Sequence, residues 1–311
     1  MTGLTSWVEI FKKSFASFWN NDCMSMAGAI AYSTVISLPA LLVLILTFTG
    51  LFIDPASVQQ ALKTQMGGMI GPTGQEQIGI ILRHAKRPDV SFGAASAMGI
   101  VVLLVGATGA FVQLQSSLNR AWEVKPDPSQ GGVRGFLLKR LLSFGFILGF
   151  AFLLLVSLVI SAALSALSSQ LGRLLPGFGS WALELVNNGI SFVVITVLMA
   201  AMFKYLPDAA IAWRDVWVGA AVTTLLFILG KFIIGFYLGK TDPGAAFGAA
   251  ASLAVLLIWI YYASLIVLFG AEFTQTWAKR HGSPMIPEEG AVRVVEVEQL
   301  IQGSAVRKVD T

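Results

Sequence analysis

The stretch AAASLAVLLIWIYYASLIVLFGAEFTQTW, residues 249–277, decides the fold class of this chain. It runs for 29 residues and contains one charged side chain, that of Glu272. An α-helix needs about 20 successive apolar residues to cross the hydrocarbon core of a bilayer. The stretch therefore predicts a transmembrane helix close to the C-terminus.

Five further apolar stretches of similar length precede this one. The predicted spans cover roughly residues 24–52, 92–119, 137–168, 181–203, 216–238 and 249–277. The composition agrees, because 56% of the 311 residues are hydrophobic and 12% are charged, a balance that excludes a soluble enzyme. The predicted fold class is all-α, a polytopic membrane protein with six transmembrane helices.

The segments outside the spans have their own patterns. Apolar residues such as Trp7, Phe11 and Phe15 recur at helical spacing in residues 1–23, which predicts an amphipathic helix. It lies either in the membrane interface or packed under the bundle. Between the first two spans, about residues 55–90, we expect an external hairpin of two short helices. The transmembrane domain covers 24–280, and 281–311 is expected to be a flexible cytoplasmic tail.

The distribution of Lys and Arg predicts how the chain is oriented. With both termini inside, the cytoplasmic segments carry 14 Lys and Arg residues and the external segments carry six. Basic residues resist translocation and remain on the cytoplasmic side. Both termini are therefore expected in the cytoplasm.

Charged residues inside the predicted spans are the first candidates for a functional site, because a charge in lipid costs at least ~2.5 kcal/mol. Glu272 lies at the depth of Arg120 and Lys204, which predicts an ion pair in the inner leaflet. Lys231 lies about 10 Å from the outer end of the fifth span, close to the depth of Glu184. Such charges either lock the bundle or line a path for a solute or proton.

Uncharged polar residues also occur within the spans. Gln115 and Asn119 share one helix surface, which indicates either a polar vestibule or hydrogen bonds between helices. Tyr32 and Tyr261 lie away from the span ends and have the same two uses. The glycine spacings in GFILG (residues 145–149) and GFYLG (residues 235–239) permit close helix packing.

The composition also limits the chemistry. The chain has one cysteine, Cys23, and two histidines, so we expect neither an internal disulfide nor a zinc site of Cys and His ligands. Its basic residues are spread between the hydrophobic stretches instead of forming a groove for nucleic acid. We expect no metal, no cofactor and no nucleic-acid partner.

Four stretches, taken together, resemble the YihY/BrkB family of bacterial inner-membrane proteins. They are AGAIAYSTVISLPALLVLIL (27–46), FVQLQSSLNRAWEV (111–124), FKYLPDAAIAWRDVWVGA (203–220) and AAFGAAASLAVLLIWIYYASLIVLFGAEF (245–273). The resemblance implies a six-span protein of the bacterial inner membrane. By position it carries over these recurring residues: Asp22, Tyr32, Pro39, Gln115, Asn119, Arg120, Tyr205, Pro207, Asp215, Lys231, Tyr237, Trp259, Tyr261, Gly270 and Glu272.

Members of that family carry ribonuclease, virulence and transporter names. Phosphodiester hydrolysis usually needs clustered carboxylates with Mg²⁺, or a basic RNA groove, and this sequence offers neither pattern. We therefore expect no nuclease activity, and we do not expect an enzyme.

Our first functional hypothesis is a transporter, permease or flippase-like protein that moves an unidentified solute or amphiphile through a polar cavity between the second, fifth and sixth spans. The residues predicted to line that cavity are Tyr32, Gln115, Asn119, Arg120, Lys231, Tyr261 and Glu272. Pro39, Gly71 and Pro72 are the hinge candidates. Membrane lipids are the expected partners, and a homo-oligomer is an open alternative to a monomer. The second hypothesis is a non-transporting scaffold or envelope-integrity factor.

Overall fold

The structure is a computed structural model, and it describes most of the predicted helical core. The described residues are 3–49, 94–127, 145, 149, 179–240, 251–281, 286–288 and 290–294. Six long helices lie in these ranges: α1 (Gly3–Asn20), α2 (Cys23–Thr49), α4 (Ala94–Ala121), α6 (Gly179–Tyr205), α7 (Trp213–Lys240) and α9 (Ala251–His281). Helix α9 is the centre of the arrangement, since it packs against α1, α2, α4 and α7.

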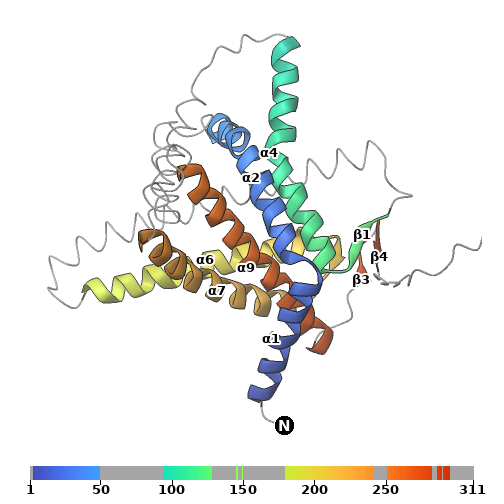
Figure 1. The fold of residues 1–311 in the computed structure, drawn as a ribbon, viewed down its shortest axis with the longest axis vertical. Coiled ribbons are helices and arrows are strands. Elements are labelled where there is room, and N and C mark those ends of the chain that lie inside the picture. Colours follow the sequence, from blue (N-terminus) through green and yellow to red (C-terminus); the bar gives the residue numbers. More distant parts are fainter. Residues whose placement is uncertain are drawn as a thin grey trace, which may run out of the picture.

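The helices converge at one end and fan out from it (Figure 1). At this end α2 and α7 begin, and α4, α6 and α9 finish. Two short antiparallel strand pairs join the segments there. Strand β1 (Val124–Pro126) pairs with β4 (Ala291–Arg293), and β2 (Ala209–Ala210) pairs with β3 (Ile286–Pro287). We call this the strand-bearing end.

The strands correct one part of the predicted flexible tail, residues 281–311, whereas residues 295–311 lie outside the described residues. Residues 286–293 contain β3 and β4, which hold the segment after α9 against the connections that follow α4 and α6. Strands of two or three residues are too short to produce an alternating apolar pattern, so no such pattern marks them in the sequence.

Three of the described helices are long and apolar enough to cross a membrane. Their candidate spans are Cys23–Ala40, Trp213–Phe236 and Leu253–His281, and α6 contributes a shorter apolar stretch, Gly189–Tyr205. The chain is thus a helical, multi-pass membrane protein. The external hairpin at 55–90 with Gly71 and Pro72, and the third predicted span apart from Gly145 and Gly149, fall outside the described residues. Pro39 lies within α2, which continues through it.

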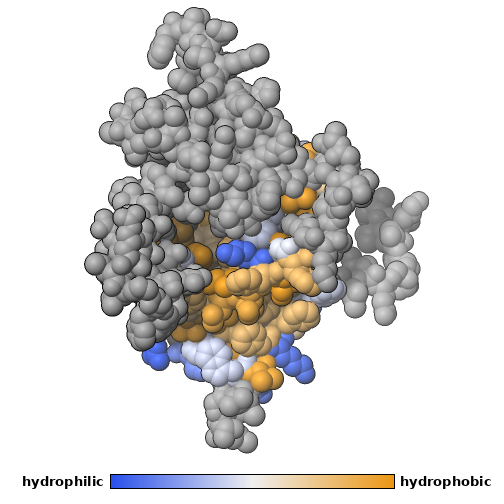
Figure 2. All heavy atoms as spheres, turned by 90° about the vertical axis from the view of Figure 1, so that its left-hand side faces the viewer, coloured by the Kyte–Doolittle hydropathy of each residue, from blue (hydrophilic) through white to orange (hydrophobic). Residues whose placement is uncertain are grey.

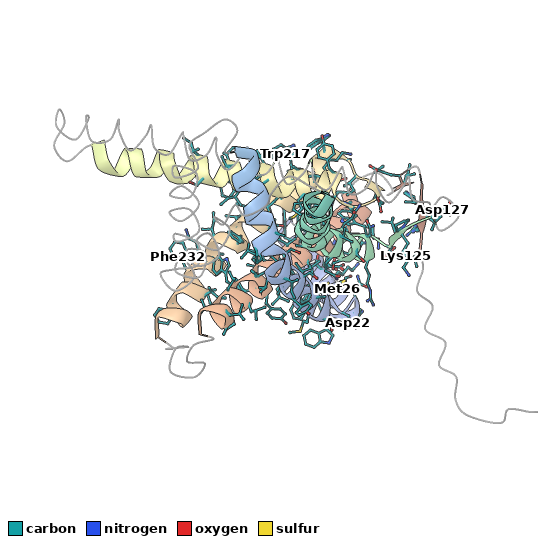
Figure 3. All side chains as sticks on the ribbon, turned by 90° about the horizontal axis from the view of Figure 1, so that it is seen from above. Asp22, Met26, Lys125, Asp127, Trp217 and Phe232 are labelled. Carbon is teal, nitrogen blue, oxygen red and sulfur yellow. The ribbon has the colours of Figure 1, made fainter. Side chains whose placement is uncertain are left out.

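One side of α7 is apolar and exposed. Leu225, Leu229, Phe232, Ile233 and Phe236 each expose more than half of their accessible surface. In Figure 3 the side chain of Phe232 points outward from the bundle. Figure 2 shows an apolar surface with hydrophilic residues at its lower margin and near its upper centre. Such a surface is suited to acyl chains.

Helices α7 and α9 run antiparallel and approach closely through a reciprocal pair of Gly and Thr residues. A Cβ atom at Gly219 of α7 would overlap the side chain of Thr274, and one at Gly270 of α9 would overlap Thr223. Each threonine hydroxyl donates to the carbonyl of the glycine four residues earlier in its own helix, at 2.7 Å for Thr223 and 2.6 Å for Thr274. The contact therefore uses GAAVT (219–223) and GAEFT (270–274).

Three glycines of the motifs GFILG and GFYLG make no such close helix contact. A Cβ atom at Gly145, Gly149 or Gly235 would meet nothing within 4 Å. At these three glycines the prediction of close packing was wrong, because glycine spacing alone does not say which side of a helix faces a neighbour. The surroundings of Gly239, the last residue of GFYLG, lie outside the described residues.

Helix α1 packs against the last turns of α9. Ile10, Ser14 and Phe18 form its buried side. The ring of Trp7 lies 4.9 Å from that of Trp277, and the ring of Phe11 lies 5.0 Å from that of Phe273. These contacts show that α1 packs on the bundle, which is one of the two alternatives that the sequence left for it. Phe15 and Trp19 remain 59% and 63% exposed, so α1 also presents an aromatic side outward.

Candidate functional site

The candidate site is built around Glu272 of α9, whose side chain is fully buried. Its Oε1 accepts a hydrogen bond from Nδ2 of Asn21 at 2.7 Å. The thiol of Cys23 lies 3.7 Å from the same oxygen and donates to it. Its Oε2 is buried and has no hydrogen-bond partner among the described residues. Glu272 thus holds the start of α2 through one oxygen only.

The turn between α1 and α2 aims Asn21 and Cys23 at Glu272. Asp22 lies in the left-handed region, with φ of 59°. Its N–H donates to the carbonyl of Trp19 at 3.2 Å, and its own carbonyl accepts from the N–H of Met26 at 3.1 Å. Asp tolerates this conformation better than most residues. One residue therefore ends α1 and starts α2, and Figure 3 shows it on the same side as Met26.

A second carboxylate, Asp208, lies in the connection between α6 and α7. Nδ2 of Asn119 donates to Oδ2 of Asp208 at 2.7 Å, and Nε2 of Gln115 donates to Oδ1 at 3.3 Å. The backbone N–H of Asp208 donates in turn to Oδ1 of Asn119 at 2.7 Å. Gln115 and Asn119 thus bind one helix connection to α4. The sequence left two alternatives for Gln115 and Asn119, a polar vestibule or hydrogen bonds to other segments, and the structure shows the hydrogen bonds.

A third carboxylate, Glu123, lies just after α4 and also adopts the left-handed region, with φ of 56°. Nζ of Lys279 lies 2.7 Å from its Oε1, and Nη2 of Arg293 lies 3.3 Å from its Oε2. Partial burial by itself would raise the pKa of Glu123, but the Lys279 and Arg293 cations outweigh it and lower the pKa below its ordinary value. Glu123 therefore links α4, α9 and β4 as a carboxylate.

The predicted ion pair between Glu272 and Arg120 or Lys204 was wrong. Glu272 bonds to Asn21 and Cys23, and Nζ of Lys204 donates to the backbone carbonyl of Ile211 at 2.6 Å. The position of a residue along its helix predicts its depth in the membrane, but it does not predict toward which neighbouring helix the side chain points. Arg120 is exposed at the end of α4.

The structure does not bring all the predicted cavity residues together. Lys231 is exposed, with Nζ 5.9 Å from the centre of the neighbouring Phe232 ring. Since Gly230 faces Tyr262, Lys231 stands ten residues of α9 away from the level of Glu272, or about 15 Å at the helical rise. Tyr32 is 66% exposed, and Tyr261 is half-buried against the core of the bundle. Lys231, Tyr32 and Glu272 thus do not form one cavity.

Sequence reasoning missed the partners of Glu272 and the role of Asp208. Asn21 and Cys23 precede the first predicted span, and no local pattern connects them to a residue 249 or more positions later. A usable signal for Asp208 was its place as the acidic residue of a short connection rich in apolar residues. Within the described residues, no group of three or more His, Cys, Asp or Glu side chains could hold a metal ion.

Comparison with known proteins gives one family and several membrane-protein relatives. The family model described as Virulence factor BrkB matches residues 14–291. A UPF0761 membrane protein of Alteromonas mediterranea is 30% identical over 253 residues, which cover 80% of each chain. Another, from Verminephrobacter eiseniae, is 29% identical, and the match covers 80% of this chain but 57% of the relative.

A third relative is the "Putative ribonuclease-like protein YfkH" of Bacillus subtilis. It is 24% identical over 289 residues, which cover 89% of this chain and 98% of the relative. No solved structure matches the chain. The chain thus spans nearly all of some relatives and little more than half of others.

Proposed function

The chain belongs to the Virulence factor BrkB family, and from that premise we propose that it is a transport protein of the bacterial inner membrane, which moves a solute or amphiphile across the bilayer. The proposal includes six spans with both termini in the cytoplasm. Helices α4 and α6 both finish at the strand-bearing end, as a further span between them requires, and the N-terminal helix and the strands after α9 lie at the same end of the bundle. The bias of Lys and Arg places that end in the cytoplasm.

The observation that carries the transport proposal is the environment of Glu272. It is a fully buried acidic residue within a candidate span, and no Lys or Arg among the described residues forms an ion pair with it. An ionisable side chain inside the membrane is costly and is kept mainly where it serves a path or a switch. Its single hydrogen-bonded oxygen joins α9 to the turn that starts α2, so a change at this carboxylate reaches two helices directly.

The nearby Gly–Thr contact supports the same proposal. Gly270 and Thr274 flank Glu272 on α9 and fix the distance between α9 and α7. Helix α9 thus approaches α7 closely, whereas its hydrogen bonds to the start of α2 involve a single carboxyl oxygen of Glu272. Movement of α1 and α2 against α9 would open the bundle at the strand-bearing end.

The test is a flux measurement in proteoliposomes with the variant Glu272→Gln. Glutamine keeps the size of the side chain and can still accept a hydrogen bond from Asn21, but it carries no charge. The probe is a phosphatidylglycerol with a fluorescent label, in vesicles of phosphatidylethanolamine and phosphatidylglycerol, and an impermeant quencher reports its movement between leaflets. We expect the variant to lose about tenfold in rate, the equivalent of one charged hydrogen bond.

Glu288→Gln is the matched control, because Glu288 is exposed between β3 and β4 and the chemical change is identical. It should keep the wild-type rate. A folded Glu272→Gln protein with an unaltered rate would remove Glu272 from the transport path, and a wild-type rate equal to that of empty vesicles would contradict lipid transport.

A scaffold remains the second proposal. The exposed aromatic side of α1 favours it, since Phe15 and Trp19 are available to a partner. Residues 286–293 support it less, because their strands are already paired with β1 and β2. A nuclease is not part of either proposal. Glu272 and Asp208 are each held by side-chain amides.

A further inference from the structure

A groove lies between α1 and α9 at the strand-bearing end and has a volume of about 540 Å³. This volume is in the range of ~300–1,000 Å³ that small-molecule sites occupy. Its charged lining comes from Glu9 and Lys13 on α1 and from Lys279 and Arg280 on α9. Three cations thus face one anion.

Two of the three cations have partners, and one does not. Arg280 lies 2.9 Å from Glu9, and Lys279 lies 2.7 Å from Glu123. Lys13 is exposed and forms no ion pair with another described residue. The groove therefore has an uncompensated positive charge at Lys13, beside two further cations that are already held in place.

The wall of the groove also contains a polar group that lacks a full hydrogen bond. Gln275 lines the groove from α9 and is 2% exposed. Its amide interacts with the Glu123 carboxylate and helps to lower the pKa of Glu123, but Nε2 forms no hydrogen bond of ordinary length with a described residue. A buried amide donor without such a hydrogen bond is unfavourable. An oxygen atom in the groove, together with a small rotation of this side chain, would satisfy it. Ser17 adds a hydroxyl group to the same wall.

Cations, an amide and a hydroxyl in one small groove are the donors that bind phosphate oxygens. Helix α1 carries Glu9, Lys13 and Ser17 on its groove side, whereas Trp7 and Phe11 contact the rings of α9 on the other. Trp side chains favour the boundary between lipid and water. A phospholipid whose headgroup entered the groove would have its chains beside this apolar, aromatic side.

We propose that the groove between α1 and α9 binds a phosphate group. The source that its position favours is the headgroup of an anionic phospholipid, and a soluble phosphate ester is the other source of the same chemistry. The site does not depend on the transport proposal, because Glu272 is not among its lining residues.

The experiment titrates the purified full chain in neutral detergent with three probes: dihexanoyl phosphatidylglycerol, dihexanoyl phosphatidylcholine and sn-glycerol 3-phosphate. Binding is measured by calorimetry. We expect phosphatidylglycerol to bind more tightly than phosphatidylcholine, because the choline cation opposes the basic lining. Lys13→Gln should weaken the binding of phosphatidylglycerol about tenfold, as expected for one charged hydrogen bond.

Lys12→Gln is the matched control, since Lys12 is the exposed neighbour on the same helix and does not line the groove. It should change the affinity by less than about twofold. Gln275→Met, which keeps the size of the side chain and removes the amide, should weaken phosphate binding without lowering the thermal midpoint.

The outcomes divide clearly. Glycerol phosphate that binds as tightly as phosphatidylglycerol supports the phosphate site and assigns its source to a soluble ester. If Lys13→Gln and Lys12→Gln lost the same affinity for phosphatidylglycerol, the overall charge of the protein would explain the effect, and the site would be overturned. Binding of neither phosphate probe above the phosphatidylcholine level would overturn it as well.

Discussion

At the scale of single residues, three carboxylates organise the strand-bearing end, and each joins segments that are distant in sequence. Glu272 holds Asn21, Asp208 is held by Asn119, and Glu123 holds Lys279. Hydrogen bonds to charged groups contribute about 1.5–3 kcal/mol where they are buried, and much less where water screens them. Glu272 belongs to the first kind and the half-exposed Glu123 to the second, whereas Asp208 is only partly buried.

The lowered pKa of Glu123 predicts a pH dependence of stability. A carboxylate whose pKa falls on folding stabilises the folded state above its unfolded pKa, 4.5, and loses that contribution as the pH falls through the lower folded value. The Glu123→Gln variant should therefore melt below the wild type at neutral pH. The difference is less than about 1 kcal/mol, because the ion pairs are partly exposed.

The measurement is the thermal midpoint of both proteins in detergent from about pH 7 to pH 3, which brackets the expected titration. The two midpoints should converge below pH 4.5, the unfolded pKa. A difference that stayed constant down to the acid limit would show that the charge of Glu123 is irrelevant to stability.

At the scale of elements, the contact between α7 and α9 is the best-defined packing in the bundle. Small residues let membrane helices approach closely, because lipid supplies no hydrophobic drive for their association. Here the threonine side chain of each helix packs against the glycine of the other. Further along α7, the ring of Tyr262 packs against Gly230. The close approach explains why Gly219, Gly230 and Gly270 have no room for a side chain.

This packing predicts that Gly219→Ala is destabilising. The added methyl group would overlap the side chain of Thr274, and overpacking of this kind costs roughly 1–3 kcal/mol. Gly235→Ala on the same helix is the control, since its Cβ would meet nothing within 4 Å, and better helix propensity should leave its stability equal or slightly higher. Thermal midpoints in detergent compare the two.

A second substitution makes the prediction more specific. Thr274→Ala in the Gly219→Ala background should recover part of the loss, because it removes the hydroxyl and methyl groups that overlap. If Gly219→Ala and Gly235→Ala melted at the same temperature, α7 and α9 would not pack as described.

At the scale of the whole molecule, the helices and strands form one connected end and a splayed remainder (Figure 1). The start of α2, the connections after α4 and α6, and the segment after α9 meet at the strand-bearing end through side-chain and strand contacts. The polar contacts among these described segments thus gather at one end of the bundle. The proposed orientation places that end in the cytoplasm.

Cysteine labelling tests this orientation. The native Cys23 is fully buried and should give little background with a membrane-impermeant maleimide. In spheroplasts we expect Thr73→Cys, in the connection that is predicted to be external, to be labelled at once. Lys12→Cys and Ser304→Cys should be labelled only after the membrane is permeabilised. Immediate labelling of Ser304→Cys would contradict a cytoplasmic C-terminus.

The sequence by itself determined the membrane class, the helical fold and the family of this protein. The membrane class and the helical fold follow from the length and polarity of stretches such as 249–277, which are local properties of the sequence. A bilayer of fixed thickness requires this length and polarity of a spanning helix. It also placed Glu272, Asn119 and Gln115 correctly as polar residues inside helices.

Only the tertiary structure decided what these residues bind. Glu272 meets Asn21 and Cys23 instead of Arg120 or Lys204, and close packing uses Gly219 and Gly270 instead of Gly235. Helical periodicity gives the depth of a residue and its neighbours on one helix. The rotation of each helix, and the partner it meets, depend on contacts between segments up to 251 residues apart, which no local pattern contains.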